Sequence, residues 1–177
     1  MQEIAMTILD IAQNSIRACA KLIQIVIRDS HKDNIIHIEC LDDGCGMDDK
    51  TLQKVTDPFY TTRTTRQIGL GIPMFKESVE ATGGWFSIES QKGVGTKIIG
   101  EYVKNHLDTP PMGNIAETLI TLIQYDDHID YVFQYICDDF EWVLNTKEIK
   151  DILDGVPINQ PDIILWLKDY IKEGMQK

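Results

Sequence analysis

The chain has 177 residues, enough for one full domain or for one domain with a small appendage. Its content of 43% hydrophobic and 25% charged residues is that of a globular protein and excludes disorder of the whole chain. The formal net charge of -11 argues against binding to nucleic acid or to an anionic membrane, because both need a basic surface.

The first hundred residues alternate between helical and extended patterns. Isoleucines at helical spacing, from Ile4 to Ile11, predict an opening helix. Segments that alternate apolar and polar residues, with many β-branched side chains, predict strands, and turn residues separate them. In chain order we predict a helix at 2–20, strands at 22–30 and 35–43, helices at 48–55 and 70–81, and strands at 85–90 and 96–103.

The prolines, glycine and asparagines of residues 105–114 predict a boundary, which divides the chain into domains at 1–105 and 106–177. The second part has an α+β pattern, and no motif indicates its role. Its aromatic residues from Tyr131 to Trp142 alternate at strand spacing, which favours packing in a core or on a sheet face, with a partner or dimer surface as the alternative. We predict here a helix at 114–123, strands at 129–137 and 139–145, and helices at 146–153 and 161–173.

Cysteine use and hydrophobic patterning indicate a cytoplasmic protein. The cysteines, at positions 19, 40, 45 and 137, form no C-x-x-C pair, so neither a zinc site nor a disulfide framework is expected. The N-terminus lacks the basic segment of a signal peptide. No apolar run reaches the roughly 18 to 20 residues that a transmembrane helix needs.

Three polar residues share one face of the opening helix. Asp10, Asn14 and Arg17 are spaced four and three apart, which places them on a single stripe. An acid, an amide and a guanidinium are unfavourable to bury without partners. The stripe is therefore either a solvated edge or a ligand site, in which Asn14 binds magnesium, Asp10 acts as a base and Arg17 faces phosphate.

A D-x-G-x-G pattern, DDGCGM at 42–47, ends the second predicted strand. Two glycines one residue apart allow a sharp turn and the close approach of a flat ligand. A buried carboxylate beside them is a suitable acceptor for an exocyclic amine such as adenine N6. The alternative is an ordinary type I′ hairpin turn, which Asp-Gly favours.

Two further glycine patterns follow. DPFYTTR at 57–63 precedes Gly69, Leu70 and Gly71, which open a helix whose free backbone N–H groups suit an anion. The spacing fits neither the Walker A pattern nor G-x-G-x-x-G. GVGT at 93–96 predicts a tight turn whose threonine begins a strand. A helix start without a ligand and a plain hairpin are the alternatives.

Together and in this order, these segments resemble the GHKL ATPase superfamily, and the resemblance covers residues 4–103. ILDIAQNSIRA is similar to its N box, DDGCGMD, GLGI and GVGT to its glycine boxes, and DPFYTTR to its phenylalanine box. The run from GLGI to GVGT is most similar to the catalytic domain of sensor histidine kinases. The resemblance implies the Bergerat fold, an α+β two-layer sandwich with helices on one face of a mixed sheet, to which the C-terminal α+β segment is appended.

The same resemblance implies ATP and Mg²⁺ as cofactors and a role for each matching residue. Asn14 would bind the metal, Arg17 would face phosphate, and Asp10 would be the catalytic residue. The remaining positions would contact ATP: Asp43 at adenine N6, Gly46 and Met47 along the adenine cavity, Gly69, Leu70 and Gly71 at the phosphates, and Thr96 near adenine.

Position 10 bears on the reaction. ATPases of the superfamily have a glutamate there that activates water, and many histidine kinases have asparagine, whereas Asp10 is a shorter carboxylate. Because the N box begins near residue 1, we expect no preceding domain with a phospho-acceptor histidine, which disfavours a self-phosphorylating sensor kinase. We therefore expect a regulatory protein that hydrolyses ATP or phosphorylates a partner protein, or alternatively a nucleotide-gated interaction module. A protein partner and a homodimer are both compatible with this expectation, whereas nucleic acid and membranes are not expected partners.

Overall fold

The computed structural model describes residues 3–57 and 70–176, in which six strands form one mixed sheet. The strand order is β3-β4-β2-β1-β5-β6, and every neighbouring pair is antiparallel except β1 and β5, which are parallel. The strands are β1 (Leu22–Ser30), β2 (Ile35–Asp42), β3 (Trp85–Gln91), β4 (Gly95–Val103), β5 (Asp130–Cys137) and β6 (Phe140–Asn145). Each of them agrees to within one residue at either end with a strand predicted from the sequence.

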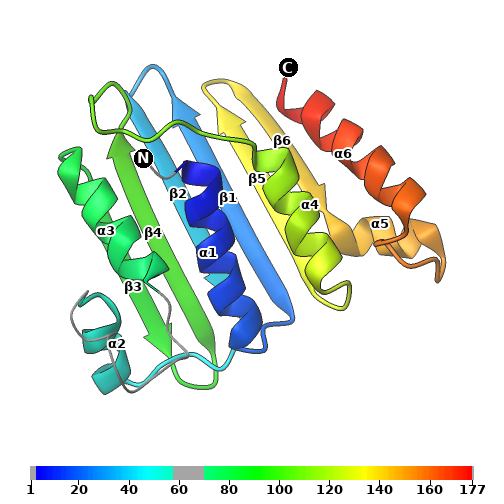
Figure 1. Ribbon diagram of the computed structural model, residues 1–177, viewed down its shortest axis with the longest axis horizontal. Helices are drawn as coiled ribbons and strands as arrows, with labels where there is room; N and C mark the ends of the chain where they lie inside the picture. Colours follow the sequence, from blue (N-terminus) through cyan, green and yellow to red (C-terminus); the bar gives the residue numbers. More distant parts are fainter. Residues whose placement is uncertain (1–2, 58–69, 177) are drawn as a thin grey trace.

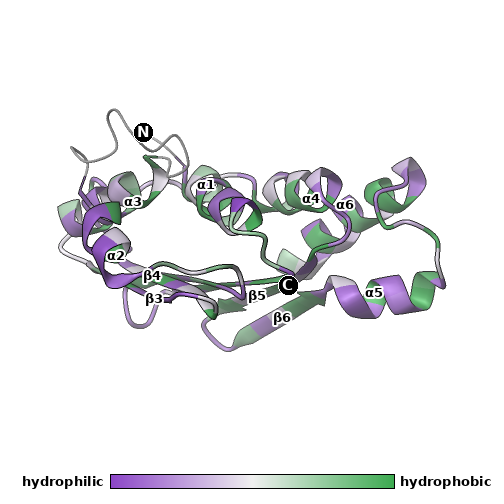
Figure 2. Cartoon of the chain, turned by 90° about the horizontal axis from the view of Figure 1, so that it is seen from below, coloured by the Kyte–Doolittle hydropathy of each residue, from purple (hydrophilic) through white to green (hydrophobic). Residues whose placement is uncertain are grey.

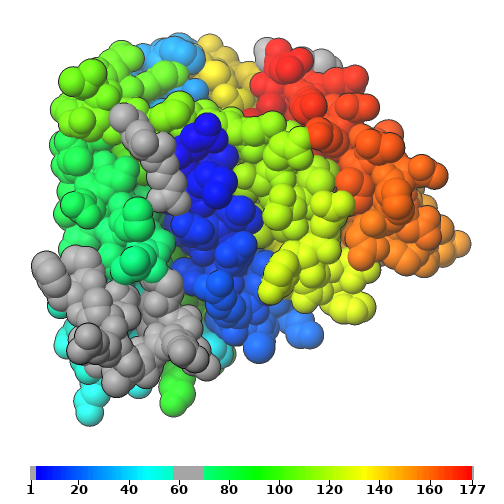
Figure 3. Space-filling model, viewed as in Figure 1, coloured from blue at the N-terminus to red at the C-terminus, as the bar shows by residue number. Residues whose placement is uncertain are grey.

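Helices cover one face of this sheet, so the fold is the two-layer sandwich expected from the sequence (Figures 1 and 2). In the space-filling view α1 lies between α3 and α4, and α6 flanks α4 (Figure 3). The described helices are α1 (Ile4–Arg17), α2 (Asp49–Val55), α3 (Gly71–Ala81), α4 (Ile115–Tyr125), α5 (Thr146–Leu153) and α6 (Pro161–Met175).

The core lies between α1 and the β1–β2 hairpin. Ile23, Ile25 and Ile27 of β1 point to the helix layer and are at most 1% exposed. Ile4 and Ile11 of α1 are buried to the same degree. Burying each such side chain contributes about 1.5–3 kcal/mol before the entropy of folding is counted. This packing sets the rotation of α1 about its axis, and so decides which face of its last turn points outward.

The C-terminal segment shares this core. β5 pairs with β1 along its length and places Phe133 beside Ile25, and Phe133 is fully buried. α4 packs on α1, where the Thr118 hydroxyl donates to the Ala5 carbonyl (3.3 Å). The aromatic side chains that point to the helix layer therefore pack inside the protein. The division at residue 105 stays a prediction, and one sheet continues across it.

Among the described helices, none combines the length and the hydrophobicity needed to cross a lipid bilayer.

A chain that ends at residue 106 tests whether the first part folds by itself. Without β5 and α4, the edge of β1 and the apolar side of α1 face water, and we expect aggregation or a broad thermal transition. Circular dichroism during heating and size-exclusion chromatography measure both. A sharp transition in a monomeric truncated chain would instead establish residues 1–106 as an independent domain.

Candidate nucleotide site

A cavity of about 460 Å³ lies where the last turn of α1 meets the end of β2 and the start of α3. This volume is within the usual range for small-molecule sites. Its polar lining comes from α1, the end of β2 and the start of β4, and an apolar group completes the wall: Ile11, Val55, Ile72 and Ile98. The lining thus combines apolar surface with a few polar groups that converge from several elements.

Asp42 is the buried carboxylate of this cavity, only 8% exposed. One oxygen, Oδ2, accepts a hydrogen bond from the Ser15 hydroxyl on α1 (2.6 Å). The other, Oδ1, accepts from the Gly44 amide (2.9 Å). Thr96 faces Asp42 across the β2–β4 ladder, so both side chains point to the helix layer. Asp42 is thereby held in one orientation beside a threonine hydroxyl.

Asp43, which the sequence analysis assigned to adenine N6, does not lie among the described lining residues. Its carboxylate is exposed and accepts hydrogen bonds from the Lys21 amide (2.7 Å) and the Leu22 amide (2.9 Å) at the start of β1. The signal for Asp42 was available in the sequence. Every second residue of β2 is buried, and that alternation brings Asp42, the first residue of D-x-G-x-G, to the helix-covered face.

Two glycines let the loop after β2 pack tightly on the β3–β4 turn. Gly46 has a φ of 62°, and a side chain there would begin 2.0 Å from the Gln91 carbonyl oxygen. Gly95 has a φ of 141°, and a side chain there would begin 1.9 Å from the Asp42 carbonyl oxygen. Only glycine fits both positions. The first and third glycine patterns therefore form one interlocked wall of the cavity.

Ser90 and Ser15 are polar contributors that the sequence analysis did not single out. The Ser90 hydroxyl accepts from the Met47 amide (2.8 Å) and lies 2.9 Å from the Thr96 hydroxyl, so it connects two lining residues. Ser15, on the buried face of α1, fixes the Asp42 carboxylate. A serine within an apolar helical stripe signals a buried hydrogen bond, because an unpaired hydroxyl there is unfavourable. The role of Ser90 depends on strand register and has no such local signal.

Asn14 and Arg17, two residues of the polar stripe on α1, line the cavity. Arg17 Nη1 donates to Asn14 Oδ1 (3.3 Å), and Asn14 Nδ2 is buried without a hydrogen-bond partner among the described residues. A buried amide without a partner costs about 1–3 kcal/mol, which a polar ligand atom can offset. The two ends of an asparagine amide exchange by rotation, so either can face a ligand. The donor set therefore fits a polar, oxygen-bearing ligand.

Asp10 lies one turn before Asn14 on α1, half-buried and outside the described lining of the cavity. A side chain on Gly71 would begin 3.0 Å from Asp10 Cβ, so the glycine lets α3 start against α1. Leu70 precedes α3 and is about half exposed, at 52%. Gly69 and the DPFYTTR segment from residue 58 onward lie outside the described residues. The catalytic and phosphate-binding roles of these positions stay predictions.

Cys40 lies on β2 two residues before Asp42, and its thiol is unreactive. Burial is the largest influence on the Cys40 thiol, followed by the negative charge of Asp42, and together they raise its pKa to about 12. Its thiol is therefore protonated at neutral pH and is no nucleophile. Cys45, by contrast, is exposed and lines the cavity.

A family comparison agrees with this geometry. The family model for the histidine kinase-, DNA gyrase B-, and HSP90-like ATPase matches residues 2–106, more than half of the chain. The fold and the interlocked glycine loops define the class of protein as a GHKL-type ATPase domain. This chain belongs to the histidine kinase-, DNA gyrase B- and HSP90-like ATPase family.

Individual relatives are much longer proteins. A protein of Shewanella frigidimarina whose name suggests a sensor is 33% identical over 99 residues, which are 55% of this chain and 15% of that one. The sensor histidine kinase WalK of Bacillus subtilis is 35% identical over 74 residues, 39% of this chain and 12% of the kinase. The chain therefore spans less than a sixth of these relatives.

A solved structure shares the fold. The MutL ATPase domain of Aquifex aeolicus, solved with ADP, superposes with a TM-score of 0.50 at 13% sequence identity. The match covers 87% of this chain and 70% of the MutL chain, so it extends beyond the 59% or so of this chain that the family model spans. At this identity the likeness concerns the fold alone.

Thiol labelling tests the described environments of the cysteines. We expect iodoacetamide at pH 8 to modify exposed Cys19 and Cys45 and to leave Cys40 unmodified, because a pKa near 12 reduces its thiolate to about a thousandth of that of an ordinary thiol. Mass spectrometry of the peptides measures each site. Equal labelling of Cys40 in folded protein would contradict its buried position.

Proposed function

We propose that the cavity binds ATP together with Mg²⁺ and that the protein transfers the γ-phosphate to water or to a partner protein in a regulatory role. One observation carries the proposal above the others: the buried Asp42 carboxylate, bonded to Ser15, faces a cavity whose glycine loops interlock. Membership of the ATPase family supports a nucleotide as the ligand.

Adenine binds beside Asp42 in this proposal. Each carboxylate oxygen has two acceptor positions, so Asp42 can accept the exocyclic N6–H group while it keeps its bonds to Ser15 and Gly44. Guanine carries a carbonyl oxygen at the corresponding position, and a carboxylate repels it. The apolar lining, including Ile98, offers the flat base a water-poor surface. Asp42 therefore selects adenine over guanine.

Residues in the last turn of α1 would hold Mg²⁺ and face the phosphates. Mg²⁺ takes oxygen ligands, keeps several waters and is shared between protein and phosphates, so one amide oxygen from Asn14 suffices as its protein ligand. Such an ion would neutralise charge on the phosphates and favour their transfer. Arg17 is exposed at the same cavity and is placed to face a phosphate.

Asp10 is the proposed general base. It lies against the N-terminus of α3, where the helix dipole favours an anion such as phosphate. A carboxylate there can take the proton from water or from a partner's side chain as it attacks. One observation favours the alternative of a nucleotide-gated interaction module: Asp10 is outside the described cavity lining, which would slow turnover without preventing ATP binding.

Replacing Asp42 and Asp43 in parallel tests the adenine assignment. We expect Asp42→Asn to weaken Mg-ATP binding by about 10–100-fold, the loss of one charged hydrogen bond, and to reduce the preference for ATP over GTP. Asp43→Asn is the matched control. The Asp43 carboxylate is next to Asp42 in the sequence but lies outside the described lining, so this substitution should leave the affinity for Mg-ATP unchanged. Isothermal titration calorimetry with both nucleotides measures these effects.

The same titrations, repeated with and without Mg²⁺, test the assignment of Asn14 as the metal ligand. Asn14→Ala should remove most of the Mg²⁺ dependence of ATP binding and leave the preference for ATP over GTP intact. If Asp43→Asn proves as damaging as Asp42→Asn, or if wild-type protein shows no binding heat with Mg-ATP, the assignment of the cavity is wrong.

Asp10→Asn tests the reaction. Loss of a general base reduces turnover by about 10²–10⁴-fold, whereas Mg-ADP affinity should stay within a few-fold of wild type. Free phosphate and protein-bound phosphate are measured separately, with purified protein and with lysate. Unchanged turnover in Asp10→Asn would rule out the base role, and a wild-type protein that binds ATP without transferring phosphate would establish the interaction module.

A further inference from the structure

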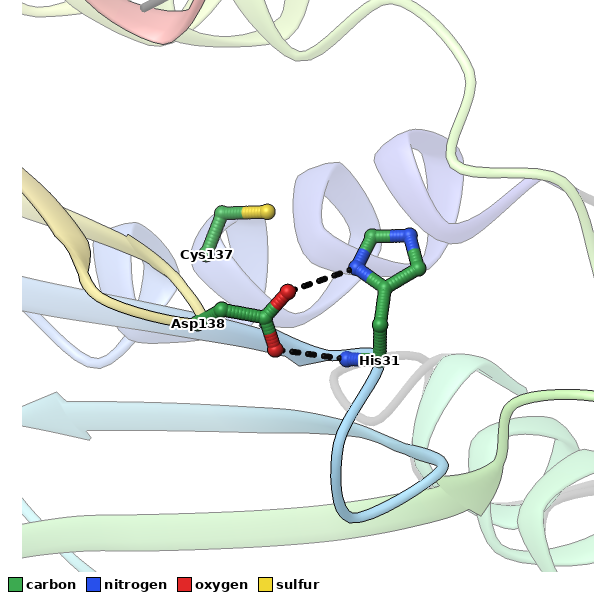
Figure 4. A group of neighbouring side chains, drawn as sticks. All are labelled: His31, Cys137 and Asp138. Carbon is green, nitrogen blue, oxygen red and sulfur yellow. Dashed lines mark hydrogen bonds and ion pairs between the residues drawn. The ribbon is translucent and has the colours of Figure 1, made fainter.

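A histidine, a cysteine and an aspartate meet at the end of the sheet away from the nucleotide cavity. His31 follows the last residue of β1, and Cys137 and Asp138 lie where β5 turns into β6. One side-chain ligand atom from each lies within 4.8 Å of the other two. Figure 4 shows the thiol and the carboxylate on the same side of the imidazole ring. The nine residues of β1, roughly 30 Å, separate this group from the cavity.

We propose that these three side chains bind one zinc ion through His31 Nδ1, Cys137 Sγ and a carboxylate oxygen of Asp138, with water as the fourth ligand. Zinc takes nitrogen, sulfur and oxygen ligands at about 2.0–2.3 Å in tetrahedral geometry, so its ligand atoms lie within about 4 Å of one another. The present spacing requires only small rotations. A thiolate and an imidazole favour zinc over Mg²⁺ or Ca²⁺, which prefer oxygen alone.

The sequence disfavoured a zinc site because the cysteines show no pairwise spacing. The ligands here come from two different turns, and His31 and Asp138 are 107 positions apart in the sequence. Only the parallel pairing of β1 with β5 brings the two turns together. Figure 1 shows the β1–β2 and β5–β6 turns side by side at that end of the sheet. A spacing rule for local metal motifs cannot detect such a site.

Backbone contacts already hold the Asp138 carboxylate in place. Its Oδ1 accepts from the amides of His31 (2.9 Å) and Lys32 (3.3 Å), and its Oδ2 lies 3.0 Å from His31 Nδ1. Oδ1 thus anchors the carboxylate, and Oδ2 is the oxygen that faces the ring.

Lys104 competes with the ion. Its ammonium lies 2.8 Å from His31 Nε2 and forms an ion pair with Asp29. It donates to Nε2 in this arrangement, so Nδ1 carries the ring proton and donates to Asp138. When zinc binds at Nδ1, the ring proton moves to Nε2, and Lys104 is displaced toward Asp29. Zinc also binds Cys137 as a thiolate, so the thiol proton is released to solvent. Binding therefore releases one proton per zinc.

A zinc ion here would join the part of the chain that matches the ATPase family to the segment that extends its sheet. The β1–β2 turn belongs to residues 2–106, and the β5–β6 turn to the segment beyond them. Because the ligands are brought together only when β5 lies on β1, zinc binds the folded chain and stabilises that pairing. This inference does not depend on the nucleotide proposal.

Zinc titration of the full chain, after chelation, tests the site. We expect one zinc per chain by elemental analysis, and a thiolate-to-metal charge-transfer band when cobalt replaces zinc. At zinc a hundredfold above Kd, the Tm should rise by about 5–10 °C. Cys137→Ser and His31→Ala should each raise the zinc Kd by more than about 100-fold, beyond the effect of losing an outer-shell partner, and abolish the Tm shift.

Matched controls separate this site from adventitious binding. Cys19→Ser and His128→Ala remove an exposed cysteine and an exposed histidine elsewhere and should leave zinc affinity unchanged. Lys104→Gln removes the competing charge and should tighten zinc about tenfold, an effect opposite to that of general destabilisation. His31 is exposed, so the His31→Ala protein should fold. It therefore tests the zinc site even if the Cys137→Ser protein fails to fold.

The proposal is overturned if wild-type protein binds no stoichiometric zinc at micromolar concentration. It is equally overturned if His31→Ala binds zinc as tightly as wild type, which would assign any zinc to other cysteines and histidines. A Lys104→Gln protein that binds zinc no more tightly would place the ion away from this ring.

Discussion

The packing of α1 on the β1–β2 hairpin is the constraint on which the rest of the structure depends. Its apolar stripe, with Ile4 and Ile11, is buried against the sheet and leaves the helix no freedom to rotate. The same rotation brings Ser15 within 2.6 Å of the Asp42 carboxylate and places Asn14 at the cavity. Folding and site formation are therefore one event, because the residues that fill the core also set the direction of the polar ones.

The family region and the segment beyond it are joined through β1. β1 pairs with β2 on one side and with β5 on the other, so its central position completes the sheet for both parts. The cavity proposed to bind ATP lies by the start of β1, and the proposed zinc ligands lie just past the end of that strand. A strand buried between two neighbours is rigid, and each end of β1 is thus a fixed platform for side chains brought by other elements.

The local patterns of the sequence determined much of the fold. Helical and period-two repeats located the described helices and strands, because both periodicities follow from backbone geometry and can be counted along a single segment. The ordered set of glycine motifs indicated the ATPase family, which the family comparison confirmed. The glycines at 46 and 95 are needed for a positive φ and a close backbone approach, which are themselves local requirements.

Tertiary structure decided what depends on contacts between distant segments. The sequence placed a carboxylate beside the first glycine loop, but pairing with β4 and packing under α1 show that Asp42, and not Asp43, reaches the cavity. Ser90 became a connecting group only through the β3–β4 register. The meeting of His31 with Cys137 required the parallel β1–β5 pairing. The alternation of apolar and polar residues along one segment shows which side chains share a face of a strand. The order of the strands depends instead on how much apolar surface the whole chain buries, and no single segment contains that information.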